Sequence, residues 1–137
     1  MIIRVLAAAI IVGAATGIAI ERAASAQQQP AGIKRTVIQR ADDPGNPGYE
    51  AIMAIAELPP GASSGKHRHH GVEVAYVLEG SSLMESGGRA ATTVKAGESI
   101  KNDLGIVHNV TNNGTTTLKV LAVYLVEKGK PLAEPAP

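Results

Sequence analysis

The chain has 137 residues, the length of a single domain, and its 13 basic and 12 acidic residues leave a formal charge of +1. This balance gives no electrostatic reason to expect nucleic acid or an anionic membrane surface as a partner. The absence of cysteine excludes disulfides and thiolate metal sites, so a bound metal would need His, Asp or Glu as ligands.

Residues 1–26 have the pattern of a secretory signal peptide. A short basic start ends at Arg4, an apolar run covers 5–20, and Ala24-Ser25-Ala26 is a small-x-small cleavage signal. The alternative, an uncleaved membrane anchor, is disfavoured because this apolar run is short for a spanning helix. We therefore expect cleavage after Ala26, a periplasmic or secreted protein without stable membrane association, and a flexible lead-in over 27–32.

From residue 33 onward, short apolar segments alternate with turn signals, which is typical of an all-β domain. Eight to ten strands and no helix are predicted, within the segments 33–40, 49–58, 67–70, 72–79, 83–85, 91–94, 99–100, 106–111 and 117–127. Such an array forms either an antiparallel sandwich or a closed barrel. We place the β domain at 33–128 and expect the proline-rich tail, 129–137, to be irregular.

The segment 61–80 carries the clearest chemical signal. His67, His69 and Glu73 share one strand parity, so an extended backbone directs their side chains to the same side. Two imidazoles and a carboxylate that converge in this way make a ready transition-metal site. His70 has the opposite parity and is expected to point away. A loose surface binder built on the His-rich run is the alternative, but it leaves the glutamate unexplained.

Two glycine-bounded motifs resemble those of the cupin superfamily. The first matches position for position, with spacings of five, one, three and six between Gly61, His67, His69, Glu73 and Gly80. The second consists of Gly97, Asp103, Gly105, His108 and Asn112. It departs from the family pattern only at Asp103, where that pattern has proline; both residue types suit a turn. The resemblance covers 61–112 and implies a single-domain jelly-roll β-barrel.

The resemblance also implies four metal ligands, namely His67, His69, Glu73 and His108. His108 shares its strand parity with two apolar residues, as an inward-facing histidine should. We expect one divalent transition metal per chain, which the residues allow to be Mn, Fe, Ni, Cu or Zn. Glu73 is in addition a candidate general base, if it loosens from the metal.

The surroundings of the site are expected to be aliphatic. Parity with Glu73 adds Ala75 and Val77 to the pocket lining, and parity with His108 adds Ile106 and Val110. No Arg or Lys falls cleanly on an inward parity near the site. A cationic clamp for a phosphorylated sugar or a dicarboxylate is therefore not expected. A small neutral or aromatic ligand that chelates the metal is favoured, and a sugar isomerase is disfavoured.

Two functions of different classes remain open. One is a metal-dependent, dioxygenase-like oxidoreductase that acts on such a small substrate; the other is a non-catalytic cupin module that binds a metal or a small-molecule ligand. The same four ligands serve both, because a fold and a ligand set do not fix a reaction. The family resemblance favours the enzyme.

Apolar strand faces predict how the domain is covered. The segment 117–127 is apolar on both faces and is expected to be buried on both. The outward parity of 72–78 is also apolar, with Val72, Val74, Tyr76 and Leu78. A face of this kind needs a cover, either another sheet or a second subunit. Together with the family resemblance, this predicts a homodimer.

Overall fold

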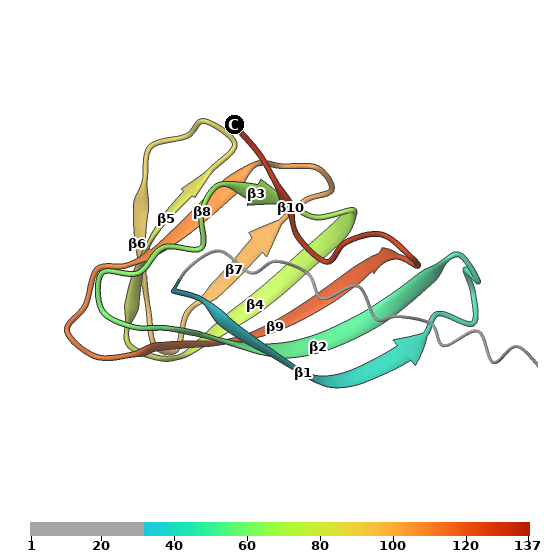
Figure 1. The fold of residues 1–137 in the computed structure, drawn as a ribbon, viewed down its shortest axis with the longest axis horizontal. Helices are drawn as coiled ribbons and strands as arrows, with labels where there is room; N and C mark the ends of the chain where they lie inside the picture. The colour runs from blue at the N-terminus through green and yellow to red at the C-terminus, as the bar shows by residue number, and fades with distance from the viewer. Residues whose placement is uncertain (1–31) are drawn as a thin grey trace, which may run out of the picture.

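The computed structural model describes residues 32–137, which contain ten β-strands and no helix (Figure 1). Their bounds are β1 (Lys34–Asp42), β2 (Tyr49–Leu58), β3 (His67–Arg68), β4 (Gly71–Glu79), β5 (Ser81–Ser86), β6 (Thr92–Lys95), β7 (Ser99–Asn102), β8 (His108–Asn112), β9 (Leu118–Glu127) and β10 (Glu134–Pro135). The all-β prediction is thereby confirmed. The expected signal peptide, 1–26, and nearly all of the lead-in lie outside the described residues. Within 32–137, no helix is long and apolar enough to cross a membrane.

The strands form two five-stranded antiparallel sheets that face each other (Figure 1). The sheets differ in the length of their strands. We call the sheet with the longer strands, β1-β2-β9-β4-β7, the large sheet, and the sheet with the shorter strands, β10-β3-β8-β5-β6, the small sheet. The chain changes sheets at each step from β2 to β5 and at each step from β6 to β10. This repeated crossing wraps one chain around a shared interior, which is the jelly-roll arrangement.

The hydrophobic core fills the space between the sheets. Along β2 and β9 every second residue is buried, as the alternation of side chains along a strand requires. In a chain without Phe or Trp, this core is built from Ala, Val, Ile, Leu and one Met, and Tyr124 is its largest fully buried side chain. Small side chains on the inner face leave room for the polar residues described below.

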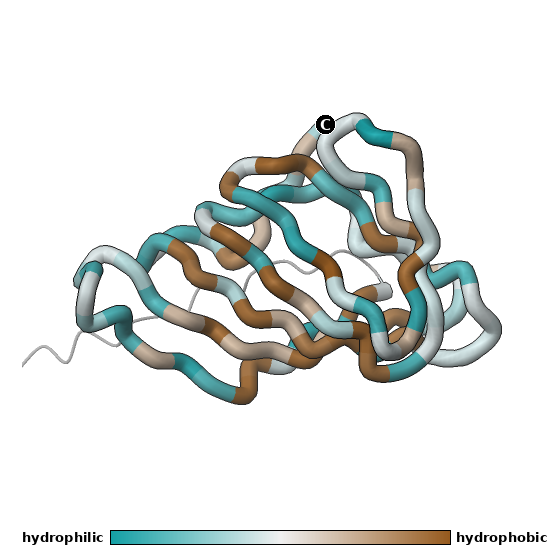
Figure 2. Tube along the Cα trace, turned by 180° about the vertical axis from the view of Figure 1, so that it is seen from behind, coloured by the Kyte–Doolittle hydropathy of each residue, from teal (hydrophilic) through white to brown (hydrophobic). Residues whose placement is uncertain are grey.

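The outer face of the large sheet is apolar and largely open. The strand registers align Met53, Val123 and Val74 in one row across β2, β9 and β4, and Figure 2 shows apolar residues recurring along these strands. Val74 is 52% exposed and Leu125 44% exposed. The prediction that 117–127 is buried on both faces is therefore wrong for the single chain, in which Leu121 and Val123 are only half-buried and Leu125 is exposed.

The segment 129–137, expected to be irregular, packs against the small sheet. Leu132 is buried, and β10 pairs with β3, where Glu134 lies opposite Arg68. The Ala136 N–H donates to the Lys66 carbonyl at 3.0 Å. The prolines hid this strand because Pro lacks an N–H, but an edge strand tolerates Pro where no donor is needed.

Candidate metal centre

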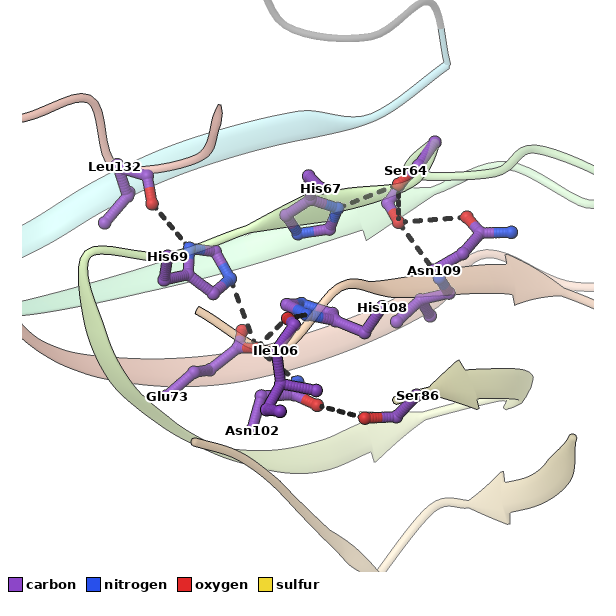
Figure 3. Close-up of polar contacts among 12 residues, drawn as sticks. Ser64, His67, His69, Glu73, Ser86, Asn102, Ile106, His108, Asn109 and Leu132 are labelled. Carbon is purple, nitrogen blue, oxygen red and sulfur yellow. Dashed lines mark hydrogen bonds and ion pairs between the residues drawn. The ribbon is translucent and has the colours of Figure 1, made fainter. Parts of the chain in front are cut away.

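The four residues expected to bind metal converge between the two sheets (Figure 3). His67 on β3 and His108 on β8 are register partners in the small sheet. Glu73 lies on β4 of the large sheet, and His69 lies in the connection between the two sheets. All four side chains are buried. The sequence placed three of them on one strand, but the chain changes sheets between them, so they meet across the interior.

Gly71 makes this change of sheet possible. A Cβ at this position would lie 1.9 Å from the carbonyl oxygen of Leu125, so β4 approaches β9 too closely there for any side chain. The close approach follows directly after His69 and His70. It fixes where the chain enters the large sheet, and hence where Glu73 faces the histidines two residues later.

The separations between ligand atoms fit a single ion. The imidazole nitrogens of the three histidines lie within 4.8 Å of one another. Glu73 Oε2 lies 3.4 Å from His69 Nε2 and 3.3 Å from His108 Nε2. Two ligand atoms that are each about 2.1 Å from one ion are roughly 3.0–3.4 Å apart when the angle between them is 90–109°. Both separations to Glu73 therefore match neighbouring positions in one coordination shell.

Each imidazole is oriented by a backbone carbonyl that accepts a hydrogen bond from its Nδ1. The acceptors for His67, His69 and His108 are, respectively, the carbonyls of Gly65 at 2.8 Å, Leu132 at 2.5 Å and Ile106 at 3.0 Å. A carbonyl oxygen only accepts, so each Nδ1 carries a proton, and each ring in its neutral form presents its Nε2 lone pair to the interior. Partners of this kind orient the histidines of metal sites.

The resulting cluster of acceptors needs a cation at its centre. The buried Nε2 of His69 has no hydrogen-bond partner, and it faces the Glu73 carboxylate, which when ionised is also an acceptor. Lone pairs that face one another are unfavourable unless a proton or a metal lies between them. Three imidazole nitrogens and one carboxylate oxygen suit a divalent first-row transition metal. The residues therefore fit the metal that the sequence predicts.

Asn102 holds the Glu73 carboxylate in place, and the sequence analysis missed it. The Asn102 Nδ2 donates to Glu73 Oε2 at 2.7 Å, and the Ser86 Oγ donates to Asn102 Oδ1 at 3.1 Å (Figure 3). The signal was present, because Asn102 shares its strand parity with the buried Ile100. A polar residue on an inward face of a short strand points to a partner within the site.

The electrostatics of the site favour an ionised Glu73. Burial alone would raise the pKa of Glu73, but the adjacent His108 and His69 side chains hold this pKa well below its usual range. A carboxylate held in this way is a good ligand and a weak base. Burial, together with the nearby His108, lowers the pKa of His67 from 6.5 to about 4.

A small, partly open cavity adjoins His67, Glu73 and His108. Its volume is about 40 Å³, on a measure by which one water needs roughly 10–15 Å³. Ala75 and Val110 lie in its lining, as parity placed them. Val77 and Ile106 lie outside it, contrary to expectation. Val77 sits further along β4 in the packed core, and Ile106 precedes β8 in a turn, where strand parity does not apply.

Arg35 lines the same cavity, so the expectation that no cationic residue lies near the site is wrong. The register of β1 and β2 places Arg35 opposite Ala56, whose side chain is buried, and antiparallel partners share a face. The Arg35 guanidinium interacts with the Tyr124 hydroxyl. A register shift between Val37 and Gln39 interrupts the alternation along β1, which obscured its inward face in the sequence.

The segment 129–137 joins the site through its backbone. It supplies the Leu132 carbonyl to His69, and Glu134 pairs with Arg68 at 2.6 Å and with His70 at 2.8 Å. The His70 side chain is thus directed to Glu134 and away from the other three histidines. Nothing in the motifs pointed to this support, because a backbone acceptor has no sequence signature.

Comparison with known proteins agrees with the architecture. Residues 54–124, about half of the chain, match the family model of the cupin domain. A curated protein of Thermotoga maritima, the oxalate-binding protein, is 37% identical over 76 residues. The match covers 55% of this chain and 62% of the relative, so the chain spans less than two thirds of that protein's length.

Two solved structures share the fold. A predicted oxalate decarboxylase from Thermotoga maritima gives a TM-score of 0.51 at 29% identity, over 68% of this chain and 94% of that one. A conserved protein of Klebsiella pneumoniae with a double-stranded β-helix domain gives a TM-score of 0.63 at 22% identity, over 76% and 86%. With the two sheets, the buried three-histidine group and the family match all in agreement, the chain belongs to the cupin family.

Proposed function

We propose that this cupin binds one divalent transition metal (Mn, Fe, Ni, Cu or Zn) through His67, His69, His108 and Glu73, and presents it to a small chelating ligand. The carrying observation is the buried cluster of acceptor atoms, in which the Nε2 of His69 has no hydrogen-bond partner. Four protein ligands leave positions open on an ion that prefers five or six. A chelating ligand would occupy those positions.

The size of the cavity supports a ligand of few heavy atoms. A volume of about 40 Å³ holds roughly three waters, which favours a compact chelator over a bulky one. Two-carbon acids are chelators of this size. The name of the Thermotoga relative, oxalate-binding protein, points to the same class, so oxalate is the first compound to test.

We further propose that the metal-loaded protein is a dioxygenase-like oxidoreductase. Its membership of the cupin family supports this proposal. When bound, the metal supplies Lewis acidity and redox chemistry. For oxalate, a two-electron oxidation breaks the carbon–carbon bond and releases two carbon dioxide molecules, while dioxygen takes up the two electrons and two protons to become hydrogen peroxide. The protein's own part is to orient the ligand set and to exclude bulk water by burial.

A non-catalytic binding module is the second candidate, and one observation favours it. The Thermotoga relative that is 37% identical to this chain is called an oxalate-binding protein, a name that states binding and no reaction. In addition, the low pKa of Glu73 makes this residue a weak base, so a step that needs proton abstraction would find little help from it. The two candidates differ in whether a bound acid is converted.

Metal analysis followed by an activity screen separates these possibilities. The wild-type chain is expected to hold about one metal per chain, His70→Ala to match it, and His108→Ala to lose most of it. His70 is the matched control because it lies next to the site but faces Glu134. A wild-type protein that stays metal-free after reconstitution with each metal would refute the metal site.

Turnover is then tested with oxalate under air and under argon. An oxidoreductase produces carbon dioxide and hydrogen peroxide in a two-to-one ratio under air, and neither product under argon. Saturable oxalate binding without any product identifies the binding module.

Two further properties complete the proposal. Residues 1–26 direct export to the periplasm or the outside of the cell, and the mature protein begins at Gln27; the mass of the purified mature chain tests this. The outer face of the large sheet pairs two chains into a homodimer. The support for the homodimer is the apolar outer face of this sheet, on which Val74, Tyr76, Leu78 and Leu125 are exposed.

A further inference from the structure

We propose that Arg35 makes the cavity selective for carboxylates, by binding a carboxylate group of the ligand that chelates the metal. The inference rests on the proposed function, since it takes the metal held by the three histidines and Glu73 as given. Arg35 belongs to neither glycine-bounded motif, and nothing in its sequence context marks it. Its role follows from where the fold places it.

The position of Arg35 is fixed by the sheet. The residue lies on the edge strand β1, two residues after the buried Ile33, and its register partner Ala56 also lines the cavity. Its guanidinium interacts with the Tyr124 hydroxyl, and its positive charge acts on the His67 imidazole. A cation is thus present on the cavity wall, within electrostatic reach of a metal ligand.

The balance of charge in the cavity calls for an anion. Among the described residues, Arg35 and Glu73 are the charged side chains in the lining, which is otherwise mostly aliphatic. These two charges cancel, and histidines bind metals as neutral imidazoles. A divalent ion therefore leaves an excess of two positive charges in a buried space, where uncompensated charge is strongly unfavourable. A small dianion removes this excess, whereas a neutral ligand does not.

Geometry favours a carboxylate over other anions. The guanidinium is planar and offers paired N–H donors that match the two oxygens of a carboxylate. A two-carbon dicarboxylate has oxygens on both ends, so one part of the molecule can chelate the metal while another faces Arg35. The cavity volume of about 40 Å³ favours a short diacid over a longer one.

Oxalate and oxamide provide a matched pair of probes, because they have the same number of heavy atoms and differ in charge. Their dissociation constants would be measured by titration calorimetry on metal-loaded wild type, Arg35→Gln, Arg35→Lys and Lys34→Gln. Lys34 is the control: it is the neighbouring cation, is largely exposed, and pairs with Glu57 at 3.3 Å. Metal dissociation constants, obtained by chelator competition, give a second readout for each variant.

Wild type is expected to prefer oxalate to oxamide. Arg35→Gln should weaken oxalate binding roughly 10- to 100-fold, the effect of one charge-assisted hydrogen bond, and leave oxamide binding nearly unchanged. Arg35→Lys should recover part of the preference, since it keeps the charge without the fork. Lys34→Gln should behave as wild type. The metal affinity of all four proteins should be similar, because Arg35 is not a ligand.

Other results overturn the proposal. Equal weakening of oxalate and oxamide in Arg35→Gln, or no weakening of either, means that Arg35 only supports the fold. If Arg35→Gln does not fold, Arg35→Lys decides: full loss of the oxalate preference with the charge kept contradicts the proposal. Wild type that binds metal without any preference for oxalate overturns this inference alone, while wild type that takes up no metal overturns the proposed function as well.

Discussion

Removal of residues 129–137 tests whether the C-terminal segment positions a metal ligand. In a chain that ends at Lys128, His69 loses the Leu132 carbonyl that accepts its Nδ1–H at 2.5 Å. The ring is then free to rotate or to change tautomer, so its Nε2 is no longer held toward the site. All four ligand side chains remain in the truncated protein; His69 loses its orienting acceptor, and β3, which carries His67, loses its pairing with β10.

The magnitude of the effect can be set from the contacts that are lost. Loss of a hydrogen-bond partner behind a metal-bound histidine weakens metal binding about 10- to 100-fold. Loss of the buried Leu132 side chain lowers the free energy of unfolding by about 1.5–3 kcal/mol. The ion pairs of Glu134 are exposed and add little. The truncated chain should therefore bind metal about 10- to 100-fold more weakly than the full chain. Loss of the Glu134 ion pairs alone would not produce an effect of this size.

The assay combines competition against a chelator of known affinity with urea unfolding. Leu132→Ala keeps the carbonyl and removes only the packing, so it should lose stability but keep most of its metal affinity. Glu134→Gln keeps both the segment and the carbonyl, and should resemble wild type in both measurements. A folded, truncated protein with wild-type metal affinity would refute the role of the Leu132 carbonyl.

Three more predictions follow from the buried polar groups and the open sheet face. Asn102→Asp places a second carboxylate beside Glu73, and like-charge repulsion should raise the pKa of Glu73 and destabilise the metal-free protein. Urea unfolding should show that this substitution lowers the free energy of unfolding less when metal is bound than when it is absent. In the metal-free protein, the folded state holds fewer protons at His67 than the unfolded state between pH 6.5 and about pH 4. Stability should therefore fall as the pH drops through this window, by up to about 3 kcal/mol, and His67→Gln should flatten the dependence; a pH-independent wild type would contradict the assignment. Tyr76→Arg on the outer face should convert a dimer into a monomer in analytical ultracentrifugation, whereas wild type that sediments as a monomer would refute the homodimer.

The positions of the ligands were readable in the sequence because spacing alone encodes them. His67, His69 and Glu73 are close in the chain, and His108 follows in a second spaced motif. Alternating apolar residues and clear turn signals likewise predicted eight to ten short strands without a helix, and the described residues contain ten. These features depend on local backbone geometry, which neighbouring residues determine.

The support around the ligands was not readable, because it comes from contacts between distant segments. Asn102 reaches Glu73 across the sheet, 29 residues later. Arg35 was missed because a register shift interrupts the parity of β1. The Leu132 carbonyl belongs to the backbone, and every residue type has one. The outer face of β9 was predicted buried because apolar composition indicates that a surface needs a cover, but it does not say whether that cover belongs to the same chain.

The bond between His69 and the Leu132 carbonyl also bears on the order of events when the chain is synthesised. The acceptor follows the histidine by 63 residues, so the ligands are present in the growing polypeptide well before the group that orients them. A metal captured earlier would meet His69 while its ring can still turn, and would be held loosely. Docking of the C-terminal segment would then be the step that fixes the orientation of His69, so that a metal bound at the proposed site before this step would dissociate more readily.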